Sequence, residues 1–395
     1  MKHLTGPWLA GCIIVGALLI GGPVSAGGSH APTYHFTVVD IPSPPGSPPR
    51  LLTLNGIANN GTMSGNYNML GGFGARVSPS LDVTPVLCST ADFIRYPYAD
   101  TLGPQVIGMN NSRMVVGNDE GVTAEYGMLQ TLDGTCTFFL VPQSVGTWAT
   151  GINDLEHAVG YYWNATGLPD EPGLLRFHGF LRNQGGFVRL DGPGPRDVVF
   201  PTAINDRGDI VGYLYSDVQL DNSYVYHAFF YQNGVYHIVD YPGKEEVWLL
   251  DVNNRGQTVG VVGSNGVVGG QAFLLDRGQF FPLPKPSDAT AYMLPTASND
   301  HGAIVGAYTE VFHPEGDLTP EHERMVFHQF LATPIHGGHP DKGLYAVKNT
   351  HRRWAARDAG PRPTNLHPKH FVPLMDADGT VVLTNGDVVL GKKNH

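Results

Sequence analysis

The chain has 395 residues, of which 51 are glycine and 31 are proline, and only 15% are charged. Hydrophobic residues make up 42% and aromatic residues 10%, which is enough to bury a sizeable core and argues against a disordered chain. The net charge of −11 argues against a nucleic-acid binder that works through a basic surface. Many turn formers and aromatics with few charges favour an all-β protein over coiled coils and helical bundles.

The N-terminus has the features of a cleavable secretion signal. A weakly positive start, Met1-Lys2-His3, precedes an apolar stretch over residues 9–20. Val24-Ser25-Ala26 is close to the small-residue pattern that precedes a signal peptidase cut, and the apolar stretch is short for a bilayer span. We predict a signal peptide over 1–26 and a secreted protein, extracellular or periplasmic, with no membrane span in the mature chain. The alternative is an uncleaved anchor.

A turn element recurs six times along the chain. Its fullest copy, at 204–212, reads Ile-Asn-Asp-Arg-Gly-Asp-Ile-Val-Gly. Asn and Asp bond their own backbone, the first Gly takes a positive φ, and the β-branched pair favours a strand. Arg113 and Glu156 replace this first glycine in copies two and three. The closing glycines are Gly65, Gly117, Gly160, Gly212, Gly260 and Gly306. About one carboxylate per turn argues against repeated calcium loops.

A second element follows each turn and has its fullest copy in His227-Ala228-Phe229. Related copies begin at His178, Gln271 and His328, and degenerate ones at 73 and 126. A third strand then ends in a Pro-Gly corner, as at 236–243. Together these elements resemble the extracellular HAF-repeat family, named for the His-Ala-Phe tripeptide, over roughly residues 35–334. The resemblance implies a secreted repeat protein and no particular chemistry.

Several short strands in each unit of about 50 residues are typical of a β-propeller blade. Six turns and six tripeptides are followed by only five third strands, and residues 35–42 match 236–242. An N-terminal strand that completes the last blade would leave no unpaired edge. We therefore predict a six-bladed, propeller-like, all-β fold over 27–334, closed by this strand. Seven blades and an open solenoid remain alternatives.

Two cysteines, Cys88 and Cys136, remain after removal of the signal peptide. An oxidising compartment and an even count favour a disulfide between them, although two buried thiols are the alternative. Their separation of 48 residues, about one repeat, places them in neighbouring blades.

The tail over 335–395 differs from the repeats in being basic and rich in His and Pro. Apolar residues on both sides of Asn385-Gly386 predict a C-terminal hairpin. His336-Gly337-Gly338-His339 lacks a third ligand at a recognised spacing, so no metal site is predicted there.

No nucleophile elbow, zinc-protease motif, phosphate loop or dinucleotide fingerprint is present, and no cofactor is predicted. Whether the protein is an enzyme stays open, and the absence of these motifs favours a non-catalytic role. His178, His227 and His328 stand at equivalent repeat positions, where they could converge on an axis or pack between blades. Repetition favours packing, because a catalytic residue is needed only once.

The segment between closing glycine and tripeptide varies in length, and the three longest loops are 161–177, 213–226 and 307–327. Repeat insertions often mark a binding face, where aromatic rings stack on sugars and carboxylates accept hydroxyl hydrogens. The alternative is that the tyrosines pack in the sheets and the acids only solvate the loops. The candidate ligand-binding residues are Tyr162, Trp163, Asp170, Tyr215, Asp217, Tyr224, His313, Glu315 and His322.

These patterns predict a monomeric binding module for a carbohydrate, a cell-surface polymer or a surface protein, without nucleic-acid partners. The alternative is an extracellular hydrolase or lyase acting on a polysaccharide or lactone. Acids of the long loops, such as Asp170, Asp217 and Glu315, would then supply general acid and base groups.

Overall fold

The computed structural model describes the chain from residue 32 to residue 340 with several gaps. The described ranges are 32–39, 52–67, 73–88, 104–120, 124–164, 177–184, 186–194, 197–216, 226–242, 246–263, 270–287, 290–312, 324–336 and 339–340. The predicted signal peptide over 1–26 and the predicted hairpin of the tail lie outside these ranges. In the described part, no helix is long and apolar enough to cross a membrane.

All regular structure in the described ranges is β-strand, arranged as consecutive antiparallel meanders of four strands. The first two meanders are β2 (Leu52–Ile57), β3 (Met63–Tyr67), β4 (Phe73–Val77) and β5 (Val83–Pro85), then β6 (Gln105–Met109), β7 (Val115–Glu120), β8 (Glu125–Gln130) and β9 (Cys136–Phe139). The third and fourth are β10 (Gly146–Ile152), β11 (Ala158–Trp163), β12 (Phe177–Asn183) and β13 (Gly186–Leu190), then β14 (Asp197–Ile204), β15 (Ile210–Ser216), β16 (Tyr226–Gln232) and β17 (Val235–Val239). The fifth is β18 (Glu246–Val252), β19 (Thr258–Gly263), β20 (Ala272–Asp276) and β21 (Gln279–Pro282). The sixth joins β22 (Thr290–Ser298), β23 (Ile304–Phe312) and β24 (Arg324–His336) to the N-terminal β1 (Tyr34–Val38), and β25 (His339–Pro340) pairs with β24.

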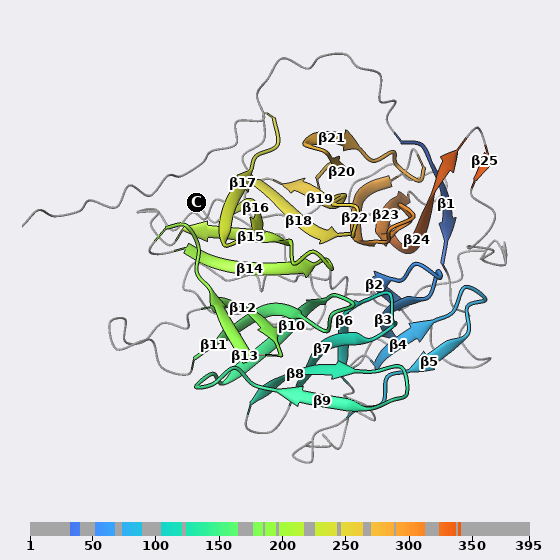
Figure 1. Cartoon of the computed structure of the whole chain (residues 1–395). Helices are drawn as coiled ribbons and strands as arrows, with labels where there is room; N and C mark the ends of the chain where they lie inside the picture. The colour runs from blue at the N-terminus through green and yellow to red at the C-terminus, as the bar shows by residue number, and fades with distance from the viewer. Residues whose placement is uncertain are drawn as a thin grey trace, which may run out of the picture.

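The meanders follow one another around a common centre, which is a β-propeller arrangement. Figure 1 shows the first strand of each meander, from β2 to β22, toward this centre and the last strands, such as β9 and β17, at the outside. The predicted all-β, propeller-like class is therefore confirmed.

Strand pairing in the described residues divides the strands into five hydrogen-bonded sheets, where the sequence predicted six separate ones. Three sheets have four strands, one has five, and one has eight. The eight-stranded sheet forms because β8 and β10 approach closely enough for one parallel pairing, between Glu125 and Gly146. A single residue pair thus merges the second and third meanders.

The N-terminal strand closes the sixth meander, as the sequence predicted. β1 runs antiparallel to β24, with Tyr34 opposite Pro334 and Val38 opposite Phe330. A backbone bond of 2.8 Å flanks the pairing at each end, from Ile335 N to Thr33 O and from Val39 N to Gln329 O. The outer edge of β24 is covered by a segment almost 300 residues away in the chain, so opening the ring requires this strand to detach.

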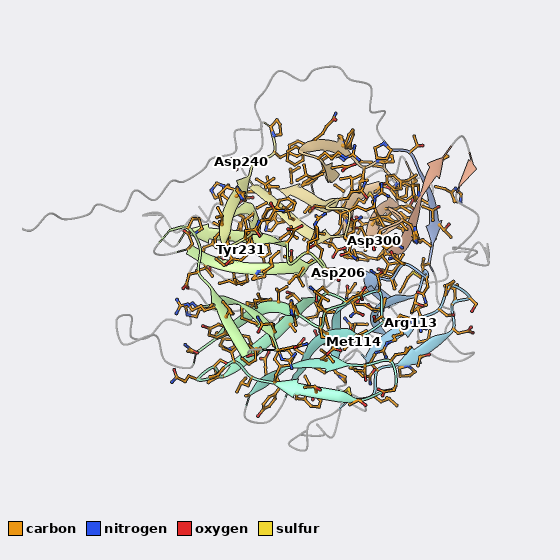
Figure 2. The ribbon with its side chains drawn as sticks, viewed as in Figure 1. Arg113, Met114, Asp206, Tyr231, Asp240 and Asp300 are labelled. Carbon is orange, nitrogen blue, oxygen red and sulfur yellow. A yellow bond between two sulfur atoms is a disulfide. The ribbon has the colours of Figure 1, made fainter. Side chains whose placement is uncertain are left out.

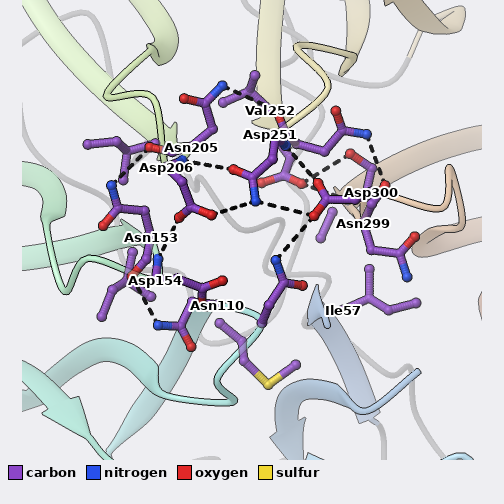
Figure 3. A pocket seen from close by; sticks show the side chains of 18 residues that line it. Ile57, Asn110, Asn153, Asp154, Asn205, Asp206, Asp251, Val252, Asn299 and Asp300 are labelled. Atoms are coloured by element: carbon purple, nitrogen blue, oxygen red, sulfur yellow. Dashed lines mark hydrogen bonds between the residues drawn. The ribbon is translucent and has the colours of Figure 1, made fainter. Parts of the chain in front are cut away.

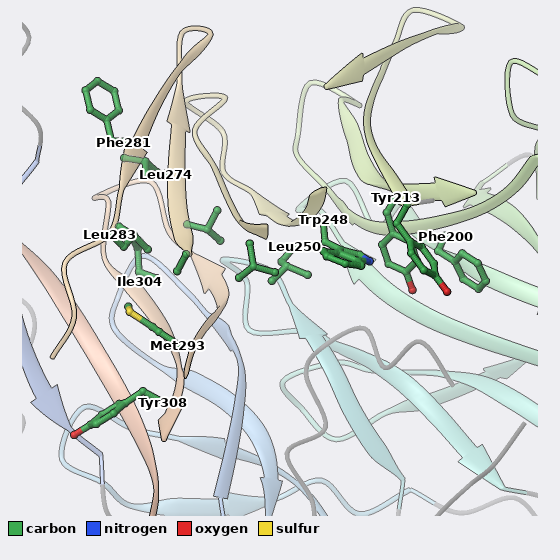
Figure 4. Packing of buried hydrophobic residues seen from close by; sticks show 14 of the residues in the cluster. Phe200, Tyr213, Trp248, Leu250, Leu274, Phe281, Leu283, Met293, Ile304 and Tyr308 are labelled. Atoms are coloured by element: carbon green, nitrogen blue, oxygen red, sulfur yellow. The ribbon is translucent and has the colours of Figure 1, made fainter. Parts of the chain in front are cut away.

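Each sheet buries apolar side chains on both faces, because neighbouring meanders pack against each other. On β18, Trp248 and Leu250 belong to one core cluster, whereas Val247 and Leu249 belong to another. The first cluster runs from the third meander to the sixth, and Figure 4 shows part of it, from Phe200 through Trp248 to Tyr308. Burial of both faces explains the low proportion of charged residues.

A β-bulge interrupts every first strand just before its turn. The register shifts at equivalent places in the six strands, for example between Ala149 and Gly151 and between Pro201 and Ala203. The skipped residue Thr150 then donates its hydroxyl to Pro201 O of the next meander at 2.8 Å. Thr202 makes the equivalent bond to Leu249 O at 2.9 Å, and Thr296 to Leu54 O. The bulge therefore frees a side chain to join neighbouring meanders.

Two glycines recur in the repeat, and the structure requires each of them for a different reason. The turn glycine has a positive φ, 81° at Gly208, and Arg113 and Glu156 adopt the same conformation with φ 63°. The closing glycine instead packs against the bulged strand: a Cβ on Gly160 would lie 1.9 Å from Trp148 O. Only a residue without a side chain fits there.

Candidate functional site

The six turns after the first strands meet at the centre of the molecule. The first residue of each Asn-containing turn is buried, and its side-chain amide donates to the backbone carbonyl of the equivalent residue in the next turn. These bonds run from Asn110 to Asn153 (3.0 Å), Asn153 to Asn205 (2.9 Å), Asn205 to Asn253 (3.2 Å), Asn253 to Asn299 (2.9 Å) and Asn299 to Ala58 (3.1 Å). Ala58, the sixth equivalent residue, has no side-chain amide to donate to the next turn.

The same asparagines also shape their own turns. The Oδ1 atom of Asn205 accepts the backbone N–H groups of Arg207 and Asp209, each at 3.0 Å. Asn is suited to both tasks, because its amide carries an acceptor for the local turn and donors for the neighbour. This explains why Asn recurs at the position in five of six copies.

The second residue of each turn forms another ring. Its backbone N–H donates to the side-chain oxygen of the second residue in the next turn, as from Asp154 to Asp206 at 2.7 Å (Figure 3). The further bonds of this ring are Asp206 to Asn254 (2.8 Å), Asn254 to Asp300 (2.7 Å), Asp300 to Asn59 (2.9 Å) and Asn59 to Asn111 (2.8 Å). Ser112 N completes the circle by donating to Asp154 at 3.0 Å.

Carboxylates of this ring also accept hydrogen bonds from side-chain amides of the neighbouring turns. The Nδ2 atom of Asn254 donates to Asp206 Oδ2 at 2.6 Å and to Asp300 Oδ2 at 3.2 Å, and Asn59 Nδ2 donates to the same Asp300 oxygen at 2.7 Å. Figure 2 places Asp206 and Asp300 near the middle of the molecule. The amides stabilise the negative charge inside the ring, so the turns hold one another together.

A polar cavity of ≈ 50 Å³ lies within this ring. It is lined by residues of the turns, by Asp251 and Ser298, and by apolar residues that precede the turns, such as Ile57 and Ile204. Such a volume holds water-sized groups rather than a drug-sized ligand. Among the described residues, no group of three or more His, Cys, Asp or Glu side chains is placed to hold a metal ion.

Asp251 is a buried carboxylate in this cavity that sequence reasoning missed. Alignment of the repeats places it where the other copies have Gly or Ala, and places Ser298 where they have Ile, Met or Val. Ser298 donates its backbone N–H to Asp251 Oδ2 at 2.6 Å and its hydroxyl to the same oxygen at 3.3 Å. The two departures from the repeat therefore compensate each other, and a column-by-column comparison of the copies would have found them.

Three of the predicted ligand-binding residues lie in the described ranges. Tyr162 and Tyr215 are both buried, at 7% exposure, and Trp163 is partly exposed at the end of β11. Tyr215 packs on Phe200 and Tyr226 within the core. The other predicted residues lie outside the described ranges: Asp170, Asp217, Tyr224, His313, Glu315 and His322.

Trp163 belongs to an aromatic cluster at the loop end of the third meander. Its ring centroid is 6.2 Å from that of Trp148 and 5.7 Å from that of Phe177. Trp148 donates its indole N–H to the carboxylate of Glu125 from the second meander. The indole of Trp163 lies directly on the backbone at Gly146, where a Cβ would be 2.0 Å from the ring. The structure thus brings two partly exposed indoles and one carboxylate together.

Tyrosine hydroxyls behind this cluster are held in their neutral form. Burial raises the pKa of Tyr213 well above its ordinary value, and the neighbouring Tyr161 adds to the effect. Burial also raises the pKa of Tyr161, with a further contribution from the Glu125 carboxylate. These phenols therefore act as packing groups at neutral pH rather than as acids or bases.

The tripeptide histidines lie on β12, β16 and β24, the third strand of their meanders, and do not converge on the centre. His178 is buried against Tyr162, with ring centroids 5.2 Å apart. His227 lies 3.5 Å from the carboxylate of Asp240, and His328 lies 3.4 Å from that of Glu310. Their surroundings differ, so the three positions are not chemically equivalent.

The predicted disulfide is confirmed: Cys88, after β5, is bonded to Cys136 on β9 with Cα atoms 6.0 Å apart. Gln130 donates toward both sulfurs and accepts from the buried Arg76 at 2.6 Å. Burial lowers the pKa of Arg76 to about 10, and its guanidinium also donates to Gln130 O and Thr131 O. This network joins the first and second meanders, where Ala58 leaves the turn ring without its amide bond.

No protein-family model matches the sequence, and no curated protein matches it. Several solved structures are similar at low identity. They include a putative TolB from Agrobacterium tumefaciens (14% identity, 60% of this chain, 82% of that chain, TM-score 0.41), a streptogramin B lyase (10%, 78%, 100%, 0.40) and the β-propeller domain of the trilobed protease from Pyrococcus furiosus (10%, 70%, 78%, 0.42). The assignment of the fold rests on the strand pairing described above.

Proposed function

We propose that the protein is a secreted, six-bladed β-propeller of the HAF-repeat kind that works as a monomeric binding module. The six turns that bond one another in sequence support six blades, with β8 and β10 of neighbouring blades touching at one residue pair. The predicted signal peptide and the Cys88–Cys136 disulfide favour an extracellular or periplasmic location.

The proposed ligand is a carbohydrate or another polar extracellular polymer. The observation that carries this proposal is the pairing of Trp163 and Trp148 with Glu125 at the loop end of the third meander. Indole faces pack on the apolar faces of sugar rings, and a carboxylate accepts hydrogen bonds from sugar hydroxyls. Trp163 is partly exposed, which suits it to contact a ligand, whereas Trp148 is oriented by its bond to Glu125.

A glycan array followed by affinity electrophoresis with the soluble polysaccharides that bind would test the proposal. Trp163→Ala should weaken binding by about tenfold, which corresponds to about 1.4 kcal/mol. Trp163→Phe is the matched control, because it keeps an aromatic face and should retain most of the affinity. Equal binding by the wild type and Trp163→Ala, at unchanged melting temperature, would rule out this surface.

A further inference from the structure

The sixth meander holds a cluster of three chemically active side chains that the binding proposal does not use. They come from three elements: Ser287 from the connection after β21, Glu310 from β23 and His328 from β24. Ser287 donates its hydroxyl to Glu310 Oε1, and His328 Nε2 lies 3.4 Å from Glu310 Oε2. One carboxylate is therefore held between a hydroxyl and an imidazole.

Strand register places Glu310 and His328 on one face of the sheet. Tyr308 is opposite His328, and Glu310 is opposite Val326, so the carboxylate and the imidazole are diagonal neighbours. The ring of Tyr308 stacks on the imidazole, with centroids 4.9 Å apart and planes inclined by 25°. Two contacts, one with Tyr308 and one with Glu310, thus fix the orientation of His328.

The cluster is accessible to small molecules. The side chains of His328 and Glu310 are 23% and 29% exposed. Because Nε2 is the nitrogen near the Glu310 carboxylate, a proton on Nε2 is favoured over one on Nδ1, which then keeps its lone pair. In the described part of the chain, Nδ1 of His328 has no hydrogen-bond partner and is not a buried atom.

We propose that His328 is a general base, oriented by Glu310, that activates water for the hydrolysis of carboxylic esters, including lactones. Water attacks the carbonyl carbon while its proton passes to Nδ1 of His328. The tetrahedral intermediate then breaks the carbon–oxygen bond to the alcohol, and the imidazolium returns the proton to the departing alkoxide. The products are the acid and the alcohol, and the Glu310 carboxylate stabilises the transient imidazolium.

The repeat itself supplies a matched comparison. His227 occupies the position of His328 in the fourth meander and also has a carboxylate neighbour, Asp240, at 3.5 Å. Its side chain and that of Asp240 are 41% and 72% exposed, and among the described residues no serine is hydrogen-bonded to this carboxylate. In the fifth meander the same position is Gln271, so glutamine is compatible with this strand. His328→Gln and His227→Gln are therefore comparable substitutions.

The test is hydrolysis of p-nitrophenyl acetate by the full chain between pH 5 and 9. The wild type should exceed the rate of the uncatalysed reaction and rise with pH through a single ionisation. His328→Gln should lower the rate at least tenfold, and His227→Gln should leave it unchanged. Glu310→Gln, which keeps the shape of the side chain, should lower kcat and leave KM unchanged, because the transient imidazolium loses its counter-charge.

Three results would overturn the proposal: no hydrolysis above background, equal rates for the wild type and His328→Gln, or equal losses in His328→Gln and His227→Gln. If His328→Gln fails to fold, Glu310→Gln decides the matter, since an unchanged kcat contradicts the assigned role. Glycan binding depends on Trp163 and not on this cluster, so failure of one proposal leaves the other standing.

Discussion

The side-chain amide of Asn299 donates to the carbonyl oxygen of Ala58 at 3.1 Å and so joins the last turn of the ring to the first. The two residues are 241 positions apart, and the bond repeats what each earlier asparagine does to the turn that follows it. Ring closure therefore relies on the same amide-to-carbonyl hydrogen bond as the contacts between consecutive turns. Ala58 is the one turn residue of this set that cannot donate such a bond.

Replacement of Asn299 by alanine should destabilise the protein markedly. The side chain is 2% exposed, and its Oδ1 atom also accepts the N–H groups of His301 (3.1 Å) and Ala303 (3.0 Å). Loss of these bonds leaves buried backbone groups unpaired, and we expect the free energy of unfolding to fall by about 2–3 kcal/mol. Urea denaturation measures the change. His301→Ala, in the exposed part of the same turn, should alter it by less than about 0.5 kcal/mol.

Replacement of Ala58 by asparagine should complete the ring and stabilise the protein. The new amide would donate to the carbonyl of Asn110, as its equivalents do in the other turns, for a gain of about 1 kcal/mol. Ala58→Asp is the control, because aspartate has a similar shape but no donor for that carbonyl. Equal melting temperatures for the two variants would show that the inter-turn bond contributes nothing.

Glu156 occupies the turn position where four of the other five copies have glycine, and its φ of 63° is costly for a residue with a side chain. We expect Glu156→Gly to raise the free energy of unfolding by about 1 kcal/mol, because relief of this strain outweighs the greater freedom of glycine in the unfolded chain. The neighbouring Leu155→Gly should instead lower stability, since φ of Leu155 is not positive. Thermal unfolding of the pair gives the comparison, and a destabilised Glu156→Gly would refute the strain.

Local chemistry let the sequence predict much of this fold. The turn at 204–208 follows from Asn, Asp and Gly, whose preferred conformations need no distant partner, and Gly208 has the expected positive φ. The sequence also shows that the closing glycines recur, but it does not show the close backbone contact that requires a glycine there. Gly160 contacts Trp148 O beside the bulge of β10. The same bulge lets the Thr150 hydroxyl donate to Pro201 O, about 50 residues away in the chain.

Side-chain exposure was harder to predict than strand position. The sequence predicts Tyr215 on a binding surface because it places this residue in the long loop 213–226, whereas the structure has it on β15. The structure buries it against Tyr226, whose ring in turn packs on Trp248 of the next meander at 5.4 Å. Alternation along one strand indicates which face a residue occupies, but both faces of these sheets are covered, so the pattern could not separate ligand contact from core.

Tyr213 gives a prediction for alkaline stability. Its hydroxyl is buried and has no hydrogen-bond partner among the described residues, and burial raises its pKa well above the ordinary value, so the folded state keeps the proton that the unfolded chain releases above pH ~10. The contribution of this phenol to stability therefore does not change with pH below pH ~10, and above it the free energy of unfolding falls by roughly 1.4 kcal/mol per pH unit. Tyr213→Phe should remove that share of the pH dependence. It should also raise the free energy of unfolding at pH 7 by about 1 kcal/mol, because an unpaired hydroxyl leaves the core. Urea denaturation of both proteins at pH 7 and pH 11 measures both effects, and parallel pH dependences would contradict the assignment.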